Sequence, residues 1–102
     1  MTVKQYRFHA HLWEYAGPTS WFFFTVPDDQ SDEIEELTSL TRRGFGSVRV
    51  RVTIGATSWN TSVFPDSKRK AYILPVKKQV RTSEGLGAGS AVDVTLELVD
   101  PV

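Results

Sequence analysis

One short segment, residues 48–54, restricts the fold of this chain more than any other part of the sequence. Apolar side chains occupy every second position there and polar ones stand between them: Val48, Arg49, Val50, Arg51, Val52, Thr53 and Ile54. Successive side chains of a β-strand point to opposite faces, so the pattern predicts a strand with one buried face. A shift by one residue would bury two arginines and expose four aliphatic side chains, so the pattern fixes the register of this strand.

Length and composition indicate one domain, residues 1–102, with twelve aromatic side chains available for its core. There is no cysteine, so no disulfide can stabilise the fold. The net charge is zero, which argues against a dedicated nucleic-acid-binding protein. The start shows no signal peptide, and the longest apolar run, residues 21–24, is far shorter than a membrane span. We therefore expect a cytoplasmic protein with no membrane association.

The charges are distributed unevenly along the chain. Six of the twelve acidic residues lie within residues 28–36, where there is no lysine or arginine. The other six face all twelve basic residues, so the rest of the chain carries a charge of +6. This distribution indicates either a bipolar surface or simply a solvated helix face at one end of the domain.

The first third of the chain predicts a hairpin followed by a helix. Residues 6–13 alternate, residues 16–20 have turn composition, and residues 21–26 read as a strand buried on both faces. The helix is expected to begin with Ser31 as its N-cap. Its apolar stripe is assigned to Ile34, Leu37 and Leu40 or Thr41. Arg42 and Arg43 are expected at its C-terminal end, where Gly44 or Gly46 stops the helix.

The remaining turns are closely spaced. After the tight Gly55-Ala56 connection, strands are expected at residues 57–64, 71–74 and 92–98, with a short helix at 76–83 that Gly85 ends. About six strands with turns every eight to twelve residues predict a small closed or nearly closed β-barrel. If the strand at 48–54 and the last strand are neighbours, their outward charges could form cross-strand pairs: Arg49, Arg51, Asp93 and Glu97.

Six ordered blocks of residues, spread from 6 to 98, together resemble a known family. They are Phe8-x-Ala10-x-Leu12-Trp13, Trp21-x-Phe23-x-x-Val26-Pro27, Arg43-Gly44-Phe45-Gly46-Ser47-Val48-x-Val50, Ile54-Gly55-x-Thr57-x-Trp59-x-Thr61-Ser62-x-Phe64-Pro65, Tyr72-x-Leu74-Pro75-Val76-Lys77 and Gly85-x-x-x-Gly89-x-x-Val92-x-Val94. The pattern resembles the small prokaryotic family called domain of unknown function 1905, whose members occur alone or fused to a YdeI/OmpD-associated domain.

The resemblance implies a mainly β fold, a six-stranded double-split barrel like that of AbrB/MazE proteins, capped by one or two short helices. It implies no established activity. Many members carry an acid after the glycine of the final turn, where this chain has Ser90. A serine hydroxyl can still bond to nearby backbone amides, so the turn itself is expected to form.

The most promising ligand-binding residues surround Trp59. A polar cluster there suggests a small-molecule cleft, and Trp13, which alternation places outward, is a further candidate: Trp59, Thr61, Ser62 and Trp13. The other explanation for the polar residues is hydrogen bonding along a strand edge. A pocket or a base-stacking platform could also be lined by the aromatic set Trp13, Trp21, Trp59, Phe22 and Phe24. In so small a barrel, core filling is the favoured role of these rings, with Trp13 as the exception.

A basic set in the second half of the chain is the candidate for nucleic-acid binding: Lys68, Arg69, Lys70, Lys77, Lys78 and Arg81. These residues could converge on one end of the barrel, although no aromatic residue interleaves them in the sequence. Solubility is the alternative role. His9 and His11 share a strand face but lack a third ligand, so no metal or cofactor is expected.

No motif of the chain links a base to a nucleophile, and the glycines of residues 85–89 lack the lysine of a phosphate-binding loop. The sequence therefore favours a non-catalytic binding or interaction module for an unknown small molecule or protein, acting as a monomer or weak homo-oligomer. A nucleic-acid-associated barrel and an enzyme with a cleft near Trp59 are the two alternatives.

Overall fold

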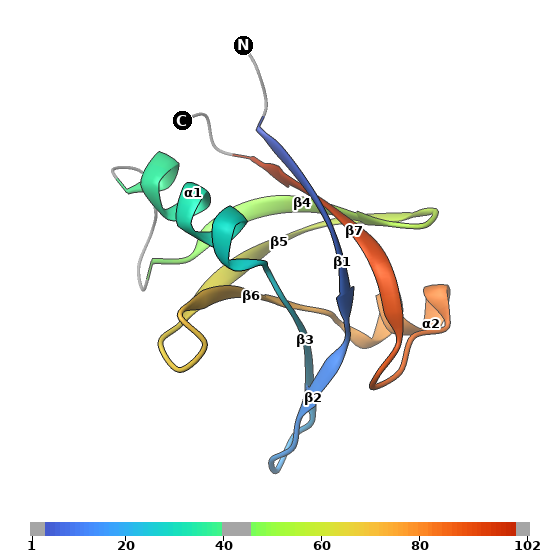
Figure 1. Ribbon diagram of the computed structural model, residues 1–102. Coiled ribbons are helices and arrows are strands. Elements are labelled where there is room, and N and C mark those ends of the chain that lie inside the picture. Colours follow the sequence, from blue (N-terminus) through green and yellow to red (C-terminus); the bar gives the residue numbers. More distant parts are fainter. Residues whose placement is uncertain (1–3, 40–45, 100–102) are drawn as a thin grey trace.

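The computed structural model describes residues 4–39 and 46–99, and within them it contains seven strands and two helices (Figure 1). The strands are β1 (Gln5–His11), β2 (Trp13–Tyr15), β3 (Trp21–Thr25), β4 (Val48–Ile54), β5 (Thr57–Asp66), β6 (Ala71–Pro75) and β7 (Ala91–Leu98). The helices are α1 (Asp28–Thr38) and α2 (Lys78–Glu84).

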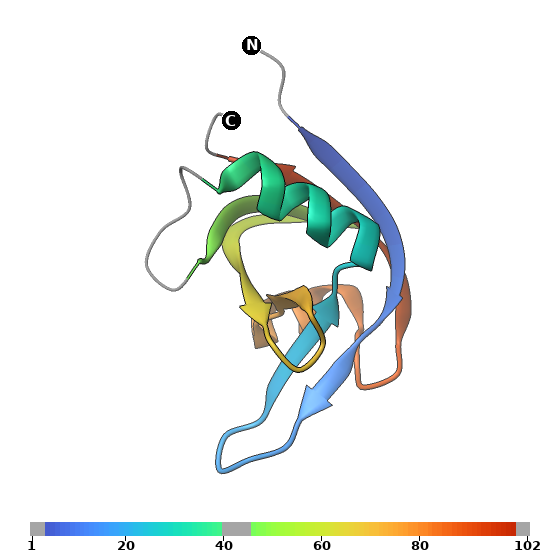
Figure 2. The ribbon, with the colours of Figure 1, turned by 60° about the vertical axis from the view of Figure 1, so that its left-hand side comes forward.

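All the strands belong to one antiparallel sheet in the order β1-β7-β4-β5-β6-β3-β2, curled into a half-barrel. Figure 2 shows α1 lying across the hollow side of this sheet. The prediction of a mainly β domain with two short helices is confirmed. The double-split arrangement stays a prediction.

Leu12 explains why there are seven strands and not six. It separates β1, which pairs with β7, from β2, which pairs with β3, so one predicted strand serves both edges of the curled sheet. The Leu12 amide donates to the carbonyl of Ser90 at 2.8 Å, and its own carbonyl accepts from the amide of Gly89 at 2.7 Å. Buried and bonded on both sides, Leu12 holds the bend at which the chain changes partners.

The strand with the clearest pattern lies at the centre of the sheet. β4 runs between β7 and β5, and its four aliphatic side chains are all buried, as predicted. The neighbouring position of β7 is also confirmed, because Arg51 lies opposite Glu97. Asp93 lies away from the arginines and instead accepts a bond from His9 Nδ1 at 2.8 Å, since β1 covers that part of β7.

Helix α1 differs from its prediction at its start. It begins three residues before Ser31, so the assignment of Ser31 as N-cap is wrong. Ser31 lies in the first turn, buried, where its hydroxyl donates to the Val26 carbonyl at 3.0 Å and accepts from the Tyr72 amide at 3.0 Å. One hydroxyl thus joins α1 to the end of β3 and to the start of β6.

The buried stripe of α1 also differs from the prediction. Ile34 is buried as expected, but Leu37 is 39% exposed and Thr38 is buried in its place, with its hydroxyl donating to the Ile34 carbonyl at 2.6 Å. The helix packs on the sheet through positions 31, 34 and 38, a spacing that leaves position 37 outside. The predicted end of the helix is wrong, because α1 ends at Thr38 and its C-cap is Ser39 in a right-handed conformation, so Gly46 does not cap it. The other residues assigned to that end, 40–44, lie outside the described residues.

Two strands also differ from their predictions, one in burial and one in length. β3 is not buried on both faces, because Trp21 is 54% exposed beside the hairpin turn. β5 continues two residues past Phe64 to Asp66, since Pro65 lies opposite Tyr72 at a position where the ladder tolerates a missing amide. The second helix begins two residues later than predicted, at Lys78, but its existence and its end at Gly85, with φ of 65°, are confirmed.

Replacing Gly55 with alanine is expected to lower the free energy of unfolding by about 1–2 kcal/mol. The residue has a φ of +57°, and an added Cβ would collide with the Glu84 carboxylate. That carboxylate accepts a bond from Thr57 Oγ1 at 2.6 Å, which ties the β4–β5 turn to α2. Urea unfolding should show the loss, whereas Gly87→Ala, with open space at its Cβ and no positive φ, should change stability by less than about 0.5 kcal/mol.

Candidate functional site

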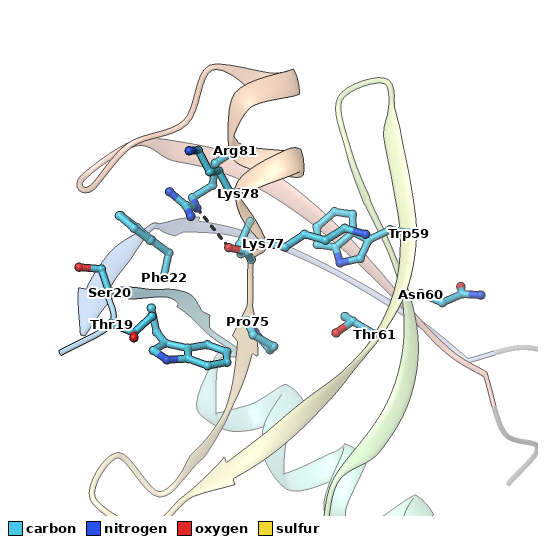
Figure 3. A pocket seen from close by; sticks show the side chains of 12 residues that line it. Thr19, Ser20, Phe22, Trp59, Asn60, Thr61, Pro75, Lys77, Lys78 and Arg81 are labelled. Atoms are coloured by element: carbon cyan, nitrogen blue, oxygen red, sulfur yellow. Dashed lines mark hydrogen bonds between the residues drawn. The ribbon is translucent and has the colours of Figure 1, made fainter. Parts of the chain in front are cut away.

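A hollow of about 410 Å³ opens between β3, β5 and α2, and we call it the basic hollow (Figure 3). Its apolar and hydroxyl-bearing walls include Trp21, Phe22, Trp59, Thr61 and Pro75. Its remaining wall carries Lys77, Lys78 and Arg81, and among the described residues that line it there is no acidic side chain. Such a hollow favours a ligand that carries negative charge and a flat apolar part.

The alternation of β5 turns two of the predicted binding residues toward this hollow. Trp59 and Thr61 lie opposite Val52 and Val50 in the register and share their inward face, whereas Asn60 points to the other side of the strand (Figure 3). Trp59 is only 8% exposed and belongs to the core cluster, so the expectation that aromatic residues fill the core holds for it. Trp59 is therefore a core residue that also forms one wall of the basic hollow.

Arg81 is held in place before any ligand arrives. Its guanidinium carbon lies 3.9 Å from the centre of the Phe22 ring, and its Nε donates to the Val76 carbonyl at 3.2 Å (Figure 3). The planar guanidinium group is suited to bind carboxylate or phosphate oxygens, and little side-chain freedom remains to be lost. Lys77 comes directly before α2, and its side chain extends toward Trp59 (Figure 3).

The other two predicted ligand-binding residues lie elsewhere. Trp13 is on the outer face of the sheet, where its Nε1 donates to Thr25 Oγ1 at 2.9 Å and its ring lies 3.9 Å from the guanidinium carbon of Arg69. Ser62 pairs with Arg49 on the outer face and does not line the basic hollow. The four candidates therefore do not form one site: two lie in the basic hollow and two outside it.

The six basic candidates are also divided, because β6 runs between them. Three of them, Lys77, Lys78 and Arg81, follow the end of β6 and line the basic hollow. Lys68 and Arg69 precede the start of β6 and line a different hollow, together with Trp13. Lys70 lines a separate hollow together with Asp32 and Glu35 of α1.

Arg69 is tied to its own strand–turn segment. Its guanidinium donates to Asp66 Oδ2 at 2.7 Å, and this bond, with the Lys68 amide, holds the pKa of the Asp66 carboxyl below its usual range. The same guanidinium packs on the ring of Trp13. In space, therefore, aromatic rings do accompany the basic residues, although none interleaves them in the sequence.

His9 and His11 lie on the exposed face of β1 and contact other side chains there. His9 bonds to Asp93, and the His9 and His11 rings lie 6.4 Å apart, edge to face. Over residues 4–39 and 46–99 no group of three His, Cys, Asp or Glu side chains could hold a metal ion. In the same part of the chain, neither helix has the length and hydropathy needed to cross a bilayer.

Ser90 has a structural contact in the final turn. Its hydroxyl accepts from the Gly87 amide at 3.0 Å, as expected for a serine that replaces an acid there. Sequence reasoning considers Trp21 and Phe22 as pocket residues but favours the core for them, because the strand from residue 21 reads as buried on both faces, and it gives Pro75 no role in a site. The available signal was the position of Trp21 beside a turn, at the end of a strand.

Comparison with known proteins identifies one family. A family model described as domain of unknown function (DUF1905) matches residues 8–96, nearly the whole chain. A search of curated proteins found no match. The match covers β2 to α2 completely and most of β1 and β7, and it includes every residue that lines the basic hollow.

Proposed function

This chain belongs to the DUF1905 family, whose function is unknown, and from the geometry of the basic hollow we propose that it is a binding module for a small organic anion with a flat apolar body. The observation that carries this proposal is the combination of three basic side chains with aromatic walls and no acid among the described lining residues. The volume of about 410 Å³ falls within the range of sites for small molecules.

The two kinds of wall have separate roles in this proposal. Phe22 and Trp21 offer apolar ring surface to a flat ligand, while Thr61 supplies a hydroxyl at the opposite wall. Arg81, already positioned by Phe22 and Val76, bonds the anionic group, and Lys77 and Lys78 raise the local positive potential. No step of catalysis is part of the proposal.

A matched pair of probes tests it, namely 1-naphthoate and 1-naphthamide, which differ in charge but share the same ring. We expect titration calorimetry to show binding of the naphthoate and at least about tenfold weaker binding of the amide, because only the carboxylate forms charge-assisted bonds. Amide and indole NMR shifts should map the naphthoate to Trp59 and Thr61.

The Arg81→Gln variant is expected to weaken naphthoate binding about tenfold. Arg49→Gln is its matched control, since Arg49 is an exposed arginine on β4 outside the hollow and its loss changes the net charge equally. Equal binding of the two probes, or equal weakening by both variants, would show that the hollow does not recognise an anion. Urea unfolding of each variant checks that it is folded.

A further inference from the structure

β2, β3 and β6 lie side by side in the sheet (Figure 1). Their outer surface is rich in exposed aromatic side chains, and we call it the outer aromatic face. It consists of Trp13, Tyr15, Trp21, Phe23, Phe64, Ile73 and Pro75, which line one hollow of about 680 Å³. The pairing of the strands brings them together, because residues directly opposite in an antiparallel sheet point to the same side. Tyr15 is 61% exposed and Trp21 54%, an arrangement that marks an interaction site.

The rings form a row that is covered at one end and open at the other. Trp13 and Phe23 have centroids 4.9 Å apart, and Phe23 and Trp21 follow at 6.2 Å with ring planes only 12° apart. Arg69 packs over Trp13 and Asp66 holds it there. At the other end Trp21 stands exposed with Tyr15 opposite it in the register, so further flat groups can stack there.

Basic side chains stand at both ends of this face. Lys68 and Arg69 line its hollow together with Asp66, whose carboxylate pairs with Arg69, so Lys68 supplies the positive charge at that end. Trp21 and Pro75 are shared with the basic hollow, which holds Lys77, Lys78 and Arg81. The acidic residues of α1 do not line either hollow. A partner that lies along the face therefore meets aromatic rings in the middle and positive charge on both sides.

We propose that the outer aromatic face binds single-stranded nucleic acid. Its bases stack on Trp21 and Tyr15, and its phosphates lie against Lys68 at one end and Lys77 or Lys78 at the other. Stacking rings bordered by cations are the elements that bind single strands without sequence preference, whereas the base faces of a duplex are already covered. The proposal goes beyond the binding of a small anion, since most of the face, including Tyr15 and Lys68, lies outside the basic hollow.

A second copy of the chain fits this face less well. A two-fold dimer would place the same patch of both copies face to face. Because cations stand at both ends of the face, either orientation of the partner brings positive charge against positive charge. A polyanion has no such repulsion.

Fluorescence anisotropy with a labelled oligothymidine of about twelve nucleotides tests the proposal, at low salt and with a duplex of equal length for comparison. We expect the single strand to bind more tightly than the duplex. Trp21→Ala and Tyr15→Ala should each weaken binding about tenfold, the loss of one stacked base. Lys68→Gln should reduce the slope of log affinity against log salt by about 0.7, because one phosphate contact is lost.

Leu37→Ala is the control, since Leu37 is a large exposed apolar residue on α1, away from the face, and should leave binding unchanged. Absence of single-strand binding at low salt, equal or tighter duplex binding, or wild-type affinity of Trp21→Ala would overturn the proposal. So would a concentration-dependent doubling of mass that Trp21→Ala abolishes, which would identify a second copy as the occupant. Tyr15 and Lys68 do not line the basic hollow, so their variants should bind 1-naphthoate normally and thereby separate the two proposals.

Discussion

Replacing Trp59 with alanine is expected to lower the free energy of unfolding by about 3–5 kcal/mol, the largest loss of any variant considered for this chain. Trp59 is 8% exposed, belongs to the core cluster and lies opposite Val52 of the central strand. The alanine would leave a cavity between the sheet and α2 that the neighbouring strands cannot fill, because the ladder fixes their positions. Urea unfolding followed by circular dichroism measures the change.

Trp21→Ala provides the matched control for this prediction. It removes the same side chain from a site that is more than half exposed, so the stability loss should stay below about 1 kcal/mol. Losses of similar size in the two variants would contradict the assignment of Trp59 to the core and of Trp21 to the surface. The comparison also shows that Trp21→Ala is folded, as the binding experiments require.

The Ser31→Ala variant is expected to lose about 2–3 kcal/mol, although it removes a single oxygen atom. The hydroxyl is buried and bonds two backbone groups, the Val26 carbonyl and the Tyr72 amide, each at 3.0 Å. Alanine cannot replace either bond. Two buried polar groups then lose a partner at once.

Hydrogen exchange gives the specific readout for this variant. The Tyr72 amide should exchange faster in Ser31→Ala. The exchange rates of the β4 amides should change only as much as the global free energy of unfolding predicts. Ser39→Ala is the control, because its hydroxyl donates to the Glu36 carbonyl at an exposed position, and its removal should be nearly neutral. Unchanged exchange at Tyr72 together with unchanged stability would contradict the bridging role of Ser31.

The separate strands and helices were largely predictable, because local patterns encode them. The alternation of β4 and β7, the Gly55-Ala56 turn and the cap at Gly85 follow from two-residue periodicity and from backbone preferences. The errors lie where tertiary contacts replaced a local preference. Serine is a residue type favoured at N-caps, but the Ser31 hydroxyl bonds to β6, a segment some forty residues away.

The candidate site was predictable in its residue types and not in its grouping. Trp59 and Thr61 were identified from a polar cluster around an aromatic residue, and both do line the basic hollow. Their partners Phe22 and Arg81 come from other elements, and their contact at 3.9 Å exists only because β3 and α2 meet. The same folding places Trp13 and Arg69 in contact with each other on the outer face, away from the basic hollow.

By itself, the sequence determined most of the strands, the buried faces of β4 and β7 and the places where the chain turns, because side-chain alternation and glycine conformations act over a few residues. Only the tertiary structure decided that the first strand divides at Leu12 to serve both edges of the sheet. It also decided which aromatic rings lie inside and which outside, and which cations stand beside them. These properties depend on how the sheet curls, since curling joins segments whose separation along the chain leaves no local signal.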